Sequence, residues 1–218
     1  MDKVIVLDIE TENTGYDIMN DNKRIISIQT YDGCEGALFY DGSENNAIEA
    51  ARSKILSTIE DDCMFAGFNI RNFDALFMNK FLGIKIPDNQ ILEISEMAQM
   101  GKIRGKLGKK KPRLADICKH LDIDCSHKNA MDQLAVRFRN LPEVLKLARD
   151  GADKWVKELG WGQEFSYNYA LDKIAGGMAI LDSFNEFVKK QGDSNLLFYK
   201  YAMGDVITEH KLLEKLQE

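Results

Sequence analysis

Short apolar runs of β-strand length recur through the first 92 residues of the chain. They are rich in β-branched and aromatic residues, and turn-forming residues separate them, as between the strands of a sheet. The predicted strands are residues 3–9, 24–30, 36–40, 63–68 and the short run Ile91-Leu92. Asp32-Gly33 separates the second strand from the third and suits the turn of a hairpin.

Apolar residues at helical spacing follow the hairpin and dominate the second half of the chain. The predicted helices are residues 43–59, 72–83, 114–121 and 195–216, together with a mostly helical stretch from 130 to 187. Within that stretch Leu141-Pro142 starts one clear helix, and Gly160-Trp161-Gly162 interrupts the pattern. A hairpin followed by strands that alternate with helices predicts an α/β fold with a mixed sheet and flanking helices.

Composition is that of an ordinary globular protein. Of the 218 residues, 44% are hydrophobic and 29% are charged, as expected of one domain with an elaboration. No apolar stretch approaches the roughly 18 residues of a membrane span, and the N-terminus lacks the features of a signal peptide. Four cysteines without short-spaced pairs indicate free thiols. We therefore expect a cytoplasmic protein without a membrane partner.

Two carboxylates come at the end of the first predicted strand. Asp8 and Glu10 follow an apolar run and project to the same face, because side chains alternate along a strand. Neighbouring carboxylates at the end of a buried strand repel each other and are costly to desolvate. A Mg²⁺ or Mn²⁺ ion between them relieves both effects. The motif alone is also compatible with a strand that simply ends in solvent.

Two further carboxylates occupy positions where such a site needs ligands. Asp74 starts a helix directly after a predicted buried strand, which places it at the carboxyl end of the sheet, where α/β folds bind ligands. Tyr201 and Asp205 lie four residues apart on the last predicted helix, and so one turn apart on one face. Four carboxylates from three segments can hold two divalent ions about 4 Å apart, as in-line displacement at a phosphodiester requires.

Residues 101–113 depart from the acidic balance of the chain, whose net charge is −6. This segment carries seven basic residues, three glycines and one proline, and it contains no acid. We interpret it as a flexible loop that contacts nucleic-acid phosphates, the alternative being a solvated surface loop. Its candidate contacts are Arg104, Lys109, Lys110, Lys111 and Arg113.

Aromatic residues gather around the break in the helical region, at Trp161, Phe165, Tyr167 and Tyr169. They either stack on bases or pack in a core, and core packing is the more common role of such residues and the one we expect.

Cysteine and histidine residues recur between positions 118 and 127 and raise the question of a zinc site. Cys118, His120, Cys125 and His127 have the right chemistry, but their spacing is not that of a common zinc finger. We favour the competing interpretation, a helix with a buried cysteine and solvated histidines.

Three motifs occur in the order LDIET (7–11), GFNIRNFD (67–74) and YAMGD (201–205). In this order, each on the element expected for it, they resemble the three exonuclease motifs of the DEDD superfamily, in its tyrosine-containing branch. The similarity is greatest to the proofreading 3′→5′ exonuclease domain of family B DNA polymerases, where a strand like RIISIQT also follows the first motif. It covers residues 1–92 and 195–216, whereas residues 129–194 do not align, and we expect no polymerase domain after the third motif.

The resemblance implies a ribonuclease-H-like fold with a helical elaboration, and a role for each matching residue. Asp8 would bridge two Mg²⁺ or Mn²⁺ ions. Glu10 and Asp205 would help hold the ion that activates water, and Asp74 would hold the second ion. Tyr201 would orient the attacking water through its hydroxyl. The candidate contacts to the terminal nucleotides are Thr11, Asn69 and Phe73, the last of which also suits a core position.

We therefore expect a metal-dependent 3′→5′ exonuclease that acts on single-stranded or frayed 3′ ends of DNA and releases nucleoside 5′-monophosphates. The resemblance to proofreading domains favours DNA. An exoribonuclease is the alternative enzyme, because no residue here reports on the 2′-hydroxyl. A non-catalytic nucleic-acid-binding or polymerase-accessory module on the same fold is the alternative of a different class. The expected partner is nucleic acid, with a polymerase or other replication or repair protein in trans as a further candidate.

Overall fold

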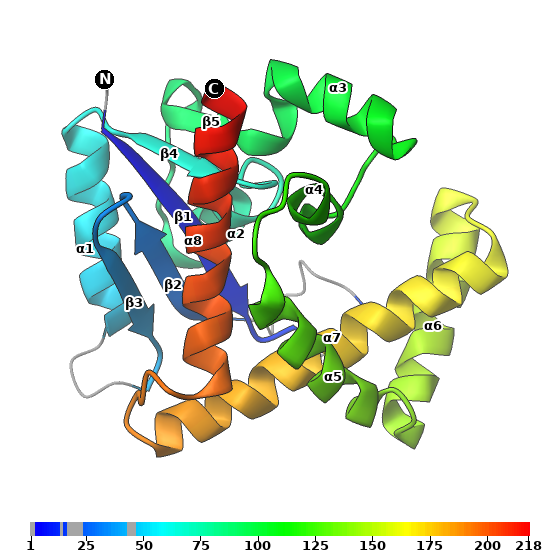
Figure 1. Cartoon of the computed structure of the whole chain (residues 1–218). Coiled ribbons are helices and arrows are strands. Elements are labelled where there is room, and N and C mark those ends of the chain that lie inside the picture. The colour runs from blue at the N-terminus through cyan, green and yellow to red at the C-terminus, as the bar shows by residue number, and fades with distance from the viewer. Residues whose placement is uncertain (1–2, 14, 17–23, 43–46) are drawn as a thin grey trace.

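A five-stranded sheet forms the centre of the molecule (Figure 1). The structure is a computed structural model that describes residues 3–13, 15–16, 24–42 and 47–218. The strands are β1 (Val4–Thr11), β2 (Ile25–Tyr31), β3 (Gly36–Tyr40), β4 (Met64–Gly67) and β5 (Ile91–Glu93). Their order in the sheet is β3-β2-β1-β4-β5, so the first strand of the chain is the central one.

The strand directions make this a mixed sheet. β1 pairs antiparallel with β2 and parallel with β4. β2 pairs antiparallel with β3, and β4 pairs parallel with β5. The carboxyl ends of β1, β4 and β5 therefore meet at one edge, which is where α/β folds bind ligands. The expectation of an α/β fold with a mixed sheet and flanking helices is confirmed.

Helices α1 (Ala47–Glu60) and α2 (Asp74–Leu82) cover one face of the sheet. Leu7 of β1 packs there with Ile55 of α1 and Phe77 of α2, and all three are 2% exposed or less. Since side chains alternate along a strand, this burial directs the two carboxylates of β1 to the opposite face.

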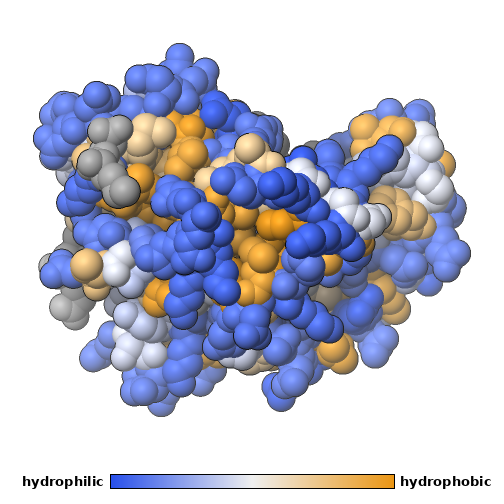
Figure 2. All heavy atoms as spheres, turned by 45° about the horizontal axis from the view of Figure 1, so that its top comes forward, coloured by the Kyte–Doolittle hydropathy of each residue, from blue (hydrophilic) through white to orange (hydrophobic). Residues whose placement is uncertain are grey.

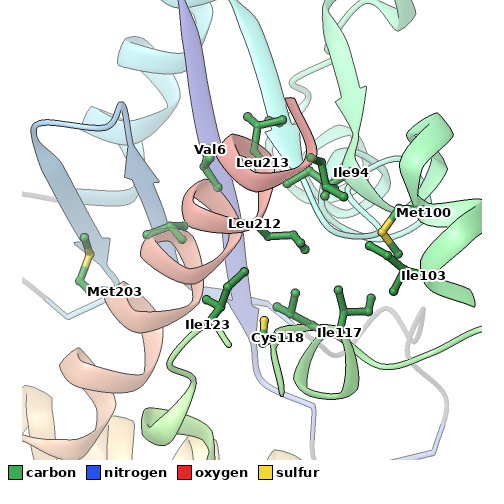
Figure 3. Packing of buried hydrophobic residues seen from close by; sticks show 14 residues of the cluster. Val6, Ile94, Met100, Ile103, Ile117, Cys118, Ile123, Met203, Leu212 and Leu213 are labelled. Carbon is green, nitrogen blue, oxygen red and sulfur yellow. The ribbon is translucent and has the colours of Figure 1, made fainter. Parts of the chain in front are cut away.

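The opposite face is covered by α8 (Leu197–Gln217), with α3 (Ala98–Leu107) and α4 (Leu114–His120) beside it. These elements share one apolar cluster with Val6 of β1, in which Leu212 of α8 lies among side chains of α3 and α4 (Figure 3). Val6 and Leu212 are fully buried. The cluster fixes α8 across β1, and so determines where the polar residues of α8 meet the strand.

The region expected to be helical contains α5 (Ser126–Phe138), α6 (Pro142–Leu159) and α7 (Gln163–Lys189). The first half of α7 packs against α6, and its second half packs against β2 and α8. Phe187 of α7 contacts Phe198 of α8 with ring centroids 5.3 Å apart. In Figure 1, α7 runs across the bottom of the molecule and connects the α6 end to the sheet.

Part of the aromatic cluster at the α6–α7 turn is exposed. Trp161 and Phe165 are 36% and 60% exposed, and their rings are in edge contact. Tyr169 contacts both rings, whereas Tyr167 packs in the core between α6 and α7. The α6–α7 turn belongs to the lobe on the right of Figures 1 and 2, where hydrophobic residues reach the surface. The expectation of core packing thus holds for Tyr167 and is wrong for Phe165.

The basic segment 101–113 is not a loop throughout, which corrects the expectation. Residues 101–107 belong to α3, and that helix ends at Gly108, whose φ of 62° is the left-handed conformation common after a helix. Met100, Ile103 and Leu107 recur at helical spacing and join the cluster around Leu212. This burial outweighs the helix-weakening effect of the glycines.

The other predicted elements agree with the observed ones to within a few residues at most ends. Residues 43–46, the expected start of α1, lie outside the described residues. Two short 3₁₀ helices, Asp88–Gln90 and Ile94–Glu96, flank β5. Among the helices that the structure describes, none is long and apolar enough to cross a membrane.

Candidate acidic site at the end of the central strand

Asp8 and Glu10 lie on β1 beside polar side chains of β2. Asp8 pairs with Gln29 across the two strands, and Glu10 pairs with Ser27. The Gln29 amide donates to Asp8 Oδ2 at 2.7 Å, and the Ser27 hydroxyl donates to Gln29 Oε1 at 3.1 Å. The second hydrogen bond orients the amide so that its nitrogen faces the carboxylate. Gln29 therefore holds Asp8 in one rotamer.

Asp205 of α8 completes a group of three carboxylates. Asp8, Glu10 and Asp205 each offer an oxygen atom, and these atoms lie within 4.8 Å of one another. Glu10 and Asp205 are only 8% and 5% exposed. Tyr201 is one turn earlier on α8 and is partly buried. The structure thus brings together residues from the first and third motifs, which are almost 200 positions apart in the chain.

Asp74 lies beside this group, at the first residue of α2. Its Oδ1 accepts a hydrogen bond from the backbone N–H of Ile9 at 3.0 Å. This bond fixes Asp74 to β1 between the two carboxylates of the strand. Asp74 is 3% exposed and interacts with Asp8, so the second motif lies next to the group formed by the first and third.

Burial and mutual repulsion raise the pKa values of these groups. Burial, and after it the charge of Asp205, raises the pKa of Asp8 from 3.8 to about 7. Burial and the charge of Asp8 raise the pKa values of Glu10 and Asp74 well above their usual range. Burial and the charge of Glu10 raise the pKa of Tyr201 in the same way, which keeps its hydroxyl protonated. Without a cation, the cluster therefore retains protons that solvent-exposed carboxyls would lose.

Lys128 of α5 supplies a positive charge to the cluster, and the sequence analysis did not identify it. Its ammonium group forms an ion pair with Asp205 Oδ1 and lies 5.3 Å from the ring centre of Tyr201. Burial alone would lower the pKa of Lys128, but the negative charge of Asp205 outweighs this effect and raises it to about 12. The opposite effect holds for Asp205, whose pKa is lowered despite burial because Lys128 and His127 contact it.

Two carboxylates outside the cluster hold the loop that precedes Asp74. Glu93 at the end of β5 accepts hydrogen bonds from the backbone N–H groups of Asn69 and Arg71, at 2.7 and 3.1 Å. Glu209 of α8 accepts one from the N–H of Phe68 at 3.1 Å. Both are 4% exposed. Glu209 had a detectable sequence signal, since it follows Asp205 by one helical turn on a buried face.

The candidate nucleotide-contacting residues differ in their exposure. Thr11 is 5% exposed, and Phe73 packs its ring 4.7 Å from that of Phe77, so both are partly or fully engaged in the fold. Asn69 is exposed and has a φ of 72°, a left-handed conformation that asparagine tolerates. Asn69 is therefore the most exposed of the three candidates, and its Oδ1 accepts a hydrogen bond from Asn72 at 3.4 Å.

The basic candidates lie on α3 and on the connection to α4. Arg104 donates to the backbone carbonyl of Ser95, and Lys109 Nζ lies 2.9 Å from Asp116 Oδ1. The other three are exposed, namely Lys110, Lys111 and Arg113. Arg104, Lys109 and Lys110 line an open hollow of about 410 Å³.

The cysteines and histidines of residues 118–127 do not form a metal-binding group. Among the described residues, the only set of three potential ligands in mutual reach is Asp8, Glu10 and Asp205. Cys118 is buried and His120 exposed, as the competing interpretation expected. That interpretation is wrong for His127, whose side chain is 11% exposed and lies against Asp205.

Comparison with models of known protein families gives no match to this chain, and comparison with curated protein sequences gives no significant relative.

Neutralising Asp8 should stabilise the metal-free protein in a pH-dependent manner. Because the folded-state pKa is raised to about 7, the stability contributed by the Asp8 proton is fully present below pH 3.8 and is lost as pH rises through 7. We expect Asp8→Asn, which has no proton to lose, to exceed the wild type by on the order of 2 kcal/mol at pH 8 in EDTA. The difference should shrink towards pH 5, as measured by urea unfolding.

Exposed Glu60 provides the matched control, because Glu60→Gln removes a carboxylate far from the cluster. Its effect on the free energy of unfolding should be small. Saturating Mn²⁺ should reverse the order of stability and favour the wild type over Asp8→Asn, since the ion stabilises only a charged cluster. Equal stability of the wild type and Asp8→Asn at both pH values would contradict the raised pKa.

Proposed function

We propose that this protein is a metal-dependent 3′→5′ exonuclease acting on DNA, with a ribonuclease-H-like fold and the active site of the tyrosine-containing DEDD branch. The observation that carries the proposal is the convergence of Asp8, Glu10 and Asp205 within 4.8 Å, at the carboxyl end of the central strand. These residues come from the first and third motifs, and Asp74 of the second motif is hydrogen-bonded to β1 beside them. The direction of cleavage and the preference for DNA rest on the resemblance in sequence.

The residues present suit a hard divalent cation. The cluster offers only carboxylate oxygens, which Mg²⁺ and Mn²⁺ prefer. Burial also raises the pKa values of Asp8 and Glu10, so these carboxyls are partly protonated in the absence of a metal. A cation that replaces the protons would reduce the repulsion between the buried carboxylates. Asp8, Glu10, Asp74 and Asp205 would be the ligands. When bound, Mg²⁺ or Mn²⁺ activates water and neutralises charge that develops on the phosphate and the leaving oxygen.

The side chains around the cluster have distinct tasks in the proposed reaction. The Tyr201 hydroxyl, which stays protonated, accepts and donates hydrogen bonds and so orients the attacking water. Gln29 and the N–H of Ile9 fix the rotamers of Asp8 and Asp74 before substrate arrives. Lys128 places a positive charge beside Asp205, where the approach of a phosphodiester is otherwise opposed by four carboxylates.

The proposed substrate is a single strand or a frayed 3′ end, because the reacting phosphate has to reach a cluster held within the fold. Exposed Asn69 and the partly exposed Phe73 precede Asp74 in the same loop and are the proposed contacts to the terminal nucleotides. Lys110, Lys111 and Arg113 are the proposed contacts to backbone phosphates further along the strand. A polymerase or another replication or repair protein is a proposed partner in trans.

Removal of single carboxylates should abolish cleavage. We expect the wild type to shorten 5′-labelled single-stranded DNA from its 3′ end in Mg²⁺ or Mn²⁺, releasing nucleoside 5′-monophosphates. Asp8→Ala and Asp205→Ala should each lower the rate by at least about 10³-fold, because each removes a ligand that charge stabilisation in the transition state requires. EDTA should have the same effect. Gel analysis of the ladder and chromatography of the products provide the measurement.

Matched RNA in the same assay distinguishes the two enzyme hypotheses, since preferential RNA cleavage would identify an exoribonuclease. Calorimetric titration with Mn²⁺ separates both from a binding module. DNA binding without saturable Mn²⁺ binding and without cleavage would contradict the exonuclease proposal. Glu60→Gln, an acidic substitution outside the cluster, should retain full activity.

Exposed lysines after α3 should contribute to DNA affinity through counterion release. We expect Lys110→Ser with Lys111→Ser to weaken binding of a single strand and to lower the salt slope of log K by up to about 1.4. Lys189→Ser with Lys190→Ser is the control, because this exposed pair carries the same charge at the end of α7, away from the α3–α4 connection. Fluorescence anisotropy in EDTA, across a salt series, measures both. Equal slopes for the two double variants would remove the α3–α4 connection from the proposed interface.

A further inference from the structure

Residues 124–128, at the start of α5, are attached to one face of α8. The Thr208 hydroxyl donates to the backbone carbonyl of Asp124 at 3.3 Å. One turn earlier on α8, Asp205 Oδ1 lies 2.9 Å from His127 Nε2 and is paired with Lys128. The preceding residues join the cluster of Figure 3, in which Ile123 and Cys118 lie near α8. The segment that carries His127 is therefore held against α8 both by the hydrogen bond from Thr208 and by the apolar cluster, and this places His127 beside Asp205.

Gly204 provides the space that the His127 ring occupies. A Cβ atom on residue 204 would lie 2.6 Å from Cγ of His127, 2.8 Å from Cδ2 and 2.9 Å from Nδ1. Distances this short require the ring to move. The His127 ring cannot move freely, since its Nε2 is hydrogen-bonded to Asp205 and the nearby backbone carbonyl of Asp124 is hydrogen-bonded to Thr208. Any side chain at position 204 would therefore displace His127 from Asp205.

The contact between His127 and Asp205 has the form of an outer-shell interaction at a metal site. His127 and Lys128 both reach Oδ1, and together they fix the rotation of the Asp205 carboxylate. A carboxylate that binds a cation needs this kind of support, because each ligand has to be oriented before the ion arrives. Lys128 alone cannot supply it, since an ammonium group on a four-carbon chain is a less directional donor than an imidazole N–H.

We propose that His127 is a positioning residue for Asp205 in the exonuclease reaction. Gly204 in the YAMGD motif, which has no side chain, leaves the space that the His127 ring needs to reach Asp205. The inference rests on the proposed function, in which Asp205 is a metal ligand. His127 donates from Nε2 to Asp205 Oδ1 and does not touch the substrate. The histidine comes from α5, outside the three motifs, so the helical region that the resemblance does not cover contributes to the acidic site.

A double-mutant cycle between His127 and Gly204 tests the proposal. His127→Ala should lower Mn²⁺ affinity and kcat by about 10- to 100-fold, with the KM for DNA within about twofold of the wild type. His127→Gln, whose amide nitrogen can still reach Oδ1, should recover part of both losses. Gly204→Ala should reproduce the loss of His127→Ala. The double variant should be no worse than either single variant, because both remove the same contact.

Thermal unfolding in EDTA provides a readout that does not depend on activity. Gly204→Ala should lower the melting temperature in the wild type, where Cβ meets the ring, and raise it in the His127→Ala background, where that space is free and alanine favours the helix. Gly101→Ala is the control, since a Cβ on this residue of α3 has no neighbour within 4 Å. It should leave Mn²⁺ affinity and kcat unchanged.

The outcomes separate this inference from the proposed function. Wild-type cleavage and Mn²⁺ binding, with His127→Ala within twofold of the wild type in both, would overturn the role of His127 alone. If the losses of His127→Ala and Gly204→Ala add in the double variant, Gly204 does not act by leaving space for the His127 ring. Failure of the wild type to bind Mn²⁺ would overturn the proposed metal site and the positioning role together. Equal losses in His127→Gln and His127→Ala would show that packing, and not the donated hydrogen bond, matters.

Discussion

The repulsion among carboxylates at the end of β1 is the constraint on which the rest of the molecule depends. Asp8, Glu10, Asp74 and Asp205 are brought together at the centre of the fold, and three of them have little contact with solvent. Such an arrangement opposes folding unless protons or cations reduce its charge. The protein does this in part with the ammonium of Lys128, and in part by retaining protons, as the pKa of about 7 at Asp8 shows. The remaining imbalance is what a divalent cation would remove, so the cost in stability and the proposed activity have the same origin.

Each layer of the fold contributes polar or charged side chains to that point. Burial of Leu7 against α1 and α2 directs Asp8 and Glu10 to the other face of the sheet. The cluster around Leu212 fixes α8 across this face and so places Asp205 over β1. The loop before Asp74 is shaped by hydrogen bonds to Glu93 and to Glu209 of α8. Finally α5, through Thr208 and Gly204 of α8, brings Lys128 and His127 to the same carboxylate. The acidic site is therefore a property of the whole packing, and no single element contains it.

Sequence patterns predicted what depends on local periodicity. The alternation in β1 and the four-residue spacing of Tyr201 and Asp205 were enough to find the acidic residues, because strand and helix geometry set the direction of side chains. Residues 101–107 were misassigned because two glycines concealed an apolar spacing at Met100, Ile103 and Leu107 whose burial favours a helix. The contacts of Lys128 and His127 with Asp205 could not be predicted, since they depend on how α5 docks against α8, and that docking is set by distant contacts such as Thr208 with Asp124. His127 was expected in solvent for the same reason, although its neighbour Gly204 was already visible in the YAMGD motif.

Anomalous scattering from crystals of the protein grown with Mn²⁺ tests the central claim most directly, because it locates the ion without relying on activity. The account predicts a manganese peak in contact with the carboxylates of Asp8, Glu10 and Asp205, and loss of that peak in Asp8→Asn crystals grown under the same conditions. Absence of manganese at these three carboxylates in the wild type, at a concentration that saturates binding in solution, would contradict it. The carboxylates would then be balanced by Lys128 and protons alone.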